Sequence, residues 1–68
     1  MTLPELREWA KVWSRILPKD MGDPVINHRL RKARRLIDPL LKNRPMSQAE
    51  AQRRAHGAYR TVYPEENT

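Results

Sequence analysis

The chain has 68 residues, which allows one small domain, and its formal net charge is +6 at pH 7. It has no cysteine, which excludes disulfides and thiolate metal sites and is typical of a cytoplasmic protein. No apolar run reaches the ~18 residues of a membrane span, so we expect a soluble protein that does not bind membranes.

The first predicted helix covers residues 3–17. Thr2 and Glu5 have the spacing of a capping box, and Pro18 disfavours helical backbone in the residue before it. Apolar residues cover about half of the helix circumference, whereas a surface helix usually has an apolar arc of about 100°. The extra apolar surface consists of Trp9, Val12 and Ile16. We expect this seam either to be covered by the flanking helices or to bind a second molecule.

The second predicted helix covers residues 24–37, with Asp23 as its N-cap and a proline at its first position. Its apolar residues recur at helical spacing on one face, and this pattern continues past Pro39. A proline inside a helix costs about 3 kcal/mol, because it removes a hydrogen bond and clashes with the preceding turn. One alternative is a single kinked helix. We favour the other, in which the helix ends before Pro39 and a short continuation over 39–43 starts with Asp38 as its cap.

All of the excess positive charge lies in residues 24–45, where seven basic residues accompany one aspartate. The flanking segments, 1–23 and 46–68, each sum to zero. The candidate binding residues on the second helix are Asn27, His28, Arg31, Lys32, Arg34, Arg35 and Lys42. The simple alternative is a solvated face opposite the apolar stripe. A face that serves solubility alone usually mixes both signs, so this asymmetry favours an anionic partner.

The third predicted helix covers residues 48–63. Ser47 and Glu50 have the spacing of a second capping box, and Pro64 ends the helix. Residues 64–68 are expected to form a disordered tail.

The same segment also has a second interpretation. The stretch SQAEAQRRAHGAYRTV resembles the opening of a repressor-type helix-turn-helix, which implies DNA binding. However, the turn glycine falls one place late, at Gly57, and Pro64 would cut the recognition helix after one turn. We therefore favour one continuous third helix.

Together these elements predict an all-α three-helix bundle that forms a single domain over residues 1–68. A homodimer through the first helix is possible, because that helix is the most apolar of the three. The two histidines, His28 and His56, lie in separate helices, and there is no glycine-rich phosphate loop. We therefore expect no enzymatic activity, metal, cofactor or small-molecule substrate.

The function predicted from these patterns is that of a small basic regulatory protein, for example in transcription. It would bind nucleic acid, DNA rather than RNA, through the arginine-rich face of the second helix. The alternative is a regulator or inhibitor that docks on a larger protein with an acidic surface. That protein would contact the same arginines and the Trp9–Val12–Ile16 seam.

Overall fold

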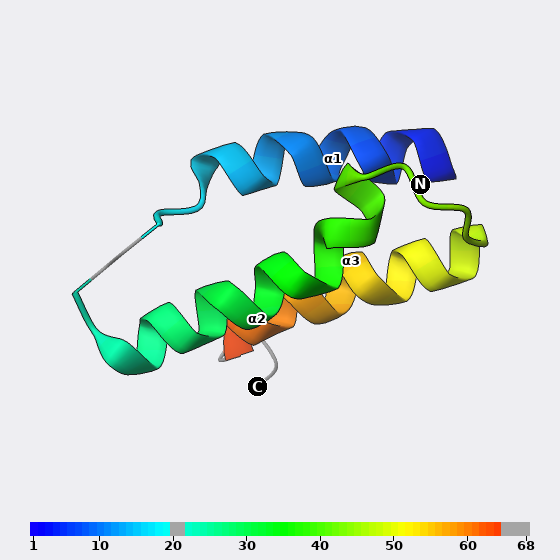
Figure 1. The fold of residues 1–68 in the computed structure, drawn as a ribbon. Helices are drawn as coiled ribbons and strands as arrows, with labels where there is room; N and C mark the ends of the chain where they lie inside the picture. Colours follow the sequence, from blue (N-terminus) through cyan, green and yellow to red (C-terminus); the bar gives the residue numbers. More distant parts are fainter. Residues whose placement is uncertain (20–21, 65–68) are drawn as a thin grey trace.

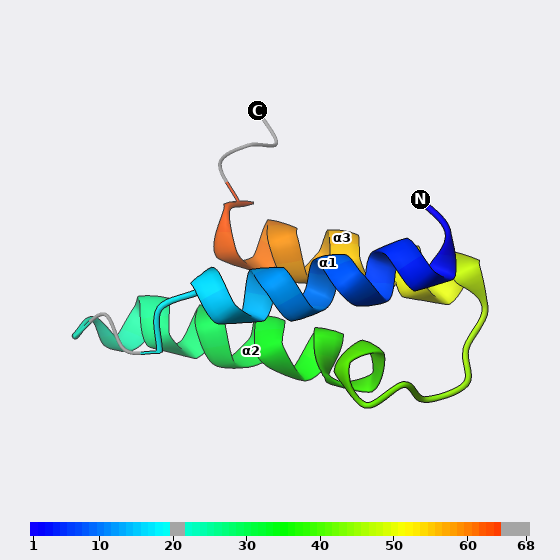
Figure 2. The ribbon, with the colours of Figure 1, turned by 90° about the horizontal axis from the view of Figure 1, so that it is seen from above.

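The computed structural model of the chain describes residues 1–19 and 22–64. This part of the chain forms α1 (Leu3–Ile16), α2 (Pro24–Leu41) and α3 (Gln48–Val62), with no strand among the described residues. Figures 1 and 2 show α1 lying over the pair formed by α2 and α3, with α1 and α3 running in the same direction and α2 in the opposite one. These features confirm the predicted all-α three-helix bundle. The tail predicted at 64–68 lies, except for Pro64, outside the described residues.

Each helix begins at the residue that its local sequence predicts. Thr2 and Glu5 form the capping box of α1, in which the Thr2 N–H donates to the Glu5 carboxylate at 2.7 Å. This backbone hydrogen bond, and then the one with the Thr2 side chain, lower the pKa of the Glu5 carboxyl below its usual value. Asp23 caps α2, and Ser47 caps α3 by accepting from the Glu50 N–H at 3.1 Å. The caps therefore fix the three helix starts.

The end of α2 differs from the prediction that we favoured. The helix continues through Pro39 to Leu41, so an end before Pro39 and a restart at Asp38 are wrong. Figure 1 shows the last part of α2 turning away from the direction of the longer first part, as in the kinked alternative. Ile37 and Leu40, on either side of the proline, are both fully buried. Their burial offsets the roughly 3 kcal/mol cost of a proline inside a helix.

The core combines larger side chains on α1 and α2 with small ones on α3. Its buried residues are Leu6, Ala10, Trp13, Leu17, Leu30, Ala33, Ile37, Leu40, Ala51, Ala55 and Ala58. Since α3 contributes only alanines to this set, its backbone can approach the other helices closely. A Cβ atom at Gly57 of α3 would lie 3.7 Å from Cδ1 of Leu36 on α2, which is an ordinary contact distance.

Two arginines connect helices through backbone carbonyls. Arg7 of α1 donates to the Arg44 carbonyl, just beyond the end of α2, at 2.9 Å. Arg54 of α3 donates to the Leu36 carbonyl at 3.2 Å, in the turn of α2 that precedes Pro39. A guanidinium group is a charged donor, and its hydrogen bonds to carbonyl oxygens are stronger than those between neutral groups. These hydrogen bonds therefore stabilise the packing of α1 and α3 against the C-terminal part of α2.

Candidate nucleic-acid interface

The exposed side of α2 carries a compact group of basic side chains. His28, Arg31, Lys32 and Arg35 are all exposed, and we call them the basic strip. Successive members are three, one and three positions apart, so they share one face of the helix over about 10 Å of its axis. The predicted second helix thus brings these four candidate residues together.

No carboxylate neutralises the basic strip within residues 1–19 and 22–64. The ion pairs in this part of the chain join Asp38 to Lys42 at 3.3 Å and Glu50 to Arg54 at 3.1 Å. Asp38 also lines a shallow hollow with Arg34 and Arg35, but it forms an ion pair with neither. Lys42, a predicted contact, lies at the end of the strip with its charge partly compensated by Asp38. The basic strip therefore keeps its positive charge without a carboxylate partner among the described residues.

Arg34, another predicted contact, has a different environment. Its guanidinium group donates to the carbonyls of Ser14, Leu17 and Pro18 at 3.0–3.2 Å. These carbonyls lie at the C-terminal end of α1, where a positive charge is favourable. Arg34 is thus a cap for α1 and does not project with the strip. Its position at the border of the apolar stripe was visible in the sequence, but its partners were not.

Asn27 was also predicted as a contact. It is half-buried and lies at the edge of the basic strip, toward α1. Its backbone N–H donates to the Asp23 carbonyl at 2.9 Å, in the first turn of α2. The structure therefore places it beside the strip.

Two arginines of α3 extend the basic surface and were missed by the sequence analysis. Arg53 is exposed and lines a hollow with Leu36 of α2. Arg60 is partly exposed and lies about one turn of α3 beyond Gly57, the residue beside Leu36 of α2. The charge sum over residues 46–68 is zero, and this sum concealed them. The available signal was the four-residue spacing of Glu50 and Arg54, which assigns the Glu50 charge to Arg54.

The predicted seam of Trp9, Val12 and Ile16 faces α3 and is only partly covered. Val12 is 48% exposed and Ile16 is 70% exposed. Trp9 is half-buried and stacks on Trp13, with ring centroids 4.9 Å apart. Trp13 in turn contacts Tyr59 of α3 at a centroid distance of 6.3 Å. The flanking helices therefore cover the aromatic end of the seam and leave its aliphatic end open.

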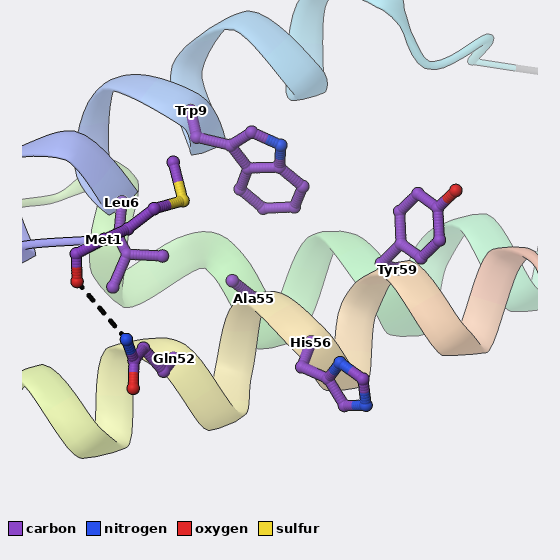
Figure 3. Close-up of a pocket in the computed structure, with 7 residues that line it drawn as sticks. All are labelled: Met1, Leu6, Trp9, Gln52, Ala55, His56 and Tyr59. Carbon is purple, nitrogen blue, oxygen red and sulfur yellow. Dashed lines mark hydrogen bonds between the residues drawn. The ribbon is translucent and has the colours of Figure 1, made fainter.

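A hollow of about 320 Å³ lies beside this seam, between α1 and α3 (Figure 3). Trp9 and Tyr59 flank it from the two helices, and Ala55 points toward it from α3. The His56 ring is directed away from it. At the N-terminal end, Gln52 Nε2 donates to the Met1 carbonyl at 3.3 Å. The hollow exists because an alanine occupies a position where a larger side chain would fill the space between the helices.

Neither a metal-binding cluster nor a membrane-spanning helix is found among the described residues. No group of three histidine, aspartate or glutamate side chains within residues 1–19 and 22–64 could hold a metal ion. In the same ranges, no helix combines the length and apolar character that crossing a lipid bilayer requires. Comparison with protein-family models, curated proteins and solved structures finds no match to this chain.

Proposed function

We propose that this chain is a small non-enzymatic protein that binds nucleic acid through the basic strip. One observation carries the proposal: four neighbouring basic side chains are exposed on α2 without a carboxylate partner among the described residues. Arg34 and Arg54, by contrast, are engaged with helix carbonyls. The charge of the strip is thus left for an external anion.

Duplex DNA is the ligand that this arrangement favours. DNA carries one negative charge per ~1.7 Å of helix axis, and each phosphate contact releases condensed counterions. Arg31, Lys32 and Arg35 lie within about 6 Å along the axis of α2, so they can face neighbouring phosphates together. Three such contacts give a slope of log K against log salt concentration near −2.7. Contacts from Arg53 and Arg60 as well would give a slope near −4.5.

The direct test is a salt titration of binding to a short labelled DNA duplex, followed by fluorescence anisotropy. We expect a slope between about −2.7 and −4.5 over about 50 to 200 mM salt. A single-stranded RNA of the same length is expected to bind more weakly. Failure to bind either nucleic acid at the lowest salt concentration would refute the proposal.

A second candidate function is favoured by the exposure of the seam. Val12 and Ile16 present aliphatic surface next to the hollow flanked by Trp9, and interface anchors commonly combine aromatic and apolar side chains. In this function the chain regulates a larger protein by docking through the seam and the arginines of the basic strip. An affinity pull-down with and without nuclease separates the two candidates. Recovery of one protein after nuclease treatment, and its loss in Trp9→Ala, would support the second.

A further inference from the structure

The seam between α1 and α3 has a different shape at its two ends. Five side chains along it, Met1, Val12, Ile16, Tyr59 and Tyr63, are each between 37% and 70% exposed. The hollow flanked by Trp9 lies toward the N-terminal end of α1, where Met1 and Leu6 also line it. The exposed Val12 and Ile16 form a ridge toward the C-terminal end of α1. A hollow and a ridge therefore lie on one continuous apolar surface.

We propose that two copies of this chain associate through the seam, with their α1 helices antiparallel across a two-fold axis. An axis that crosses α1 near Val12 places the ridge of each copy over the hollow of the other. Such an interface uses the same surface twice, as closed two-fold dimers do. Trp9, Val12 and Ile16 recur at spacings of three and four residues, the pattern that two packed helices share.

The charges on α1 fit the same pairing. Glu8 and Arg15 flank the seam, are exposed, and form no ion pair within residues 1–19 and 22–64. They are seven residues apart, about 10 Å along the helix, which is too far for a pair within one copy. The two-fold axis brings Glu8 of one copy opposite the partner's Arg15, and this contact occurs twice.

The apolar area of the seam and the distribution of charge over the molecule also suit a dimer interface. With roughly 200 Å² for a fully exposed large side chain, the five apolar side chains leave on the order of 500 Å² exposed. A standard interface buries about 800 Å² per partner, and homodimer interfaces are about 65% apolar. The exposed apolar area is therefore close to the apolar part of a standard homodimer interface, which is about 65% of 800 Å². The basic strip lies on the face of α2 opposite the buried Leu30, Ala33 and Ile37, which belong to the core shared with the other two helices. Two copies with a charge of +6 each therefore meet away from their basic strips.

The dimer has one consequence for the binding of DNA duplexes, which rests on the proposed function. In the dimer the two basic strips face outward in opposite directions, because each α2 turns its exposed side away from the seam. The dimer would therefore hold two separate duplexes, and would not read two half-sites on one duplex.

The test is sedimentation equilibrium of the intact chain. We expect a dimer for the wild type and a monomer for Ile16→Glu, which changes an exposed side chain and leaves the helical circular dichroism signal intact. Glu8→Arg and Arg15→Glu should each weaken dimerisation at least tenfold, and the double variant should restore it. Lys11→Glu, on the outer side of α1, is the matched control and should change dimerisation less than threefold.

A wild-type chain that is monomeric at about 100 μM, or a double variant that stays as weak as the single ones, would overturn the dimer. Bridging is measured by capture of a free labelled duplex on beads that carry another duplex. We expect Ile16→Glu to lose capture while it still binds one duplex. A dimer that binds no duplex would refute the proposed function and leave the dimer standing.

Discussion

Replacement of Arg31 and Arg35 by glutamine tests whether the basic strip contacts phosphates. Both side chains are exposed and without ion pairs among the described residues, and glutamine has nearly the same helix propensity as arginine. Each lost phosphate contact reduces the salt slope by about 0.9, so the double variant should change it from about −2.7 to about −0.9. At about 0.1 M salt this corresponds to a loss of roughly 60-fold in affinity, or about 2.4 kcal/mol.

The matched control is the double change of Lys11 and Arg15 to glutamine. These residues are exposed on α1 with the same four-residue spacing, and their loss removes the same charge. Arg15 flanks the seam, so this control is measured as binding to one duplex and not as dimerisation. At about 0.1 M salt the Debye length is ~10 Å, so we expect the control to lower affinity for one duplex less than threefold. Fluorescence anisotropy with one labelled duplex measures both variants. Equal losses for the two would refute the reasoning, because affinity would then follow net charge and not the strip.

Three further predictions concern the fold. Arg34→Met removes the cap of α1, so it should lower the free energy of unfolding in urea by about 2 kcal/mol without changing the salt slope of binding. Gly57→Ala should stabilise α3 by up to about 1 kcal/mol and raise the Tm, because the added Cβ would meet Leu36 at an ordinary 3.7 Å; a lower Tm would show that this contact is strained. The lowered pKa of Glu5 means that its capping contribution is present above the usual glutamate pKa and is lost as the pH falls through the folded-state value. Acid unfolding, followed by circular dichroism, should therefore depend less on pH in Glu5→Gln than in the wild type.

The helix starts could be predicted from the sequence because each depends on residues within one turn. Thr2, Asp23 and Ser47 accept hydrogen bonds from N–H groups two or three residues away. The course of the chain at Pro39 could not be predicted in the same way. It depends on burial against other helices and on a hydrogen bond from Arg54, which belongs to a helix that starts later in the chain. Local propensity thus favoured a break, and tertiary packing favoured continuation.

The candidate site, too, could be predicted from the sequence only where it depends on the spacing within one helix. His28, Arg31, Lys32 and Arg35 could be predicted as one exposed group, because helical spacing alone puts them on one face. Whether an arginine at the border of that face points outward depends on which carbonyls a neighbouring helix leaves without donors. That information exists only in the packed bundle. Arg34 was therefore assigned to the interface, while its guanidinium group is bound to the end of α1.

The two uses of arginine in this chain should respond differently to salt, and this makes the binding titration interpretable. Arg34 and Arg54 donate hydrogen bonds to carbonyls in partly buried positions, where ionic screening is weak. The contacts of the basic strip with phosphates would lie in solvent, where the Debye length falls to about 3 Å at 1 M salt. We therefore expect the helical circular dichroism signal and the Tm to stay constant between about 50 mM and 1 M salt while affinity for DNA falls steeply. A Tm that fell together with affinity would show that the salt slope reports unfolding, and the count of phosphate contacts would then lose its basis.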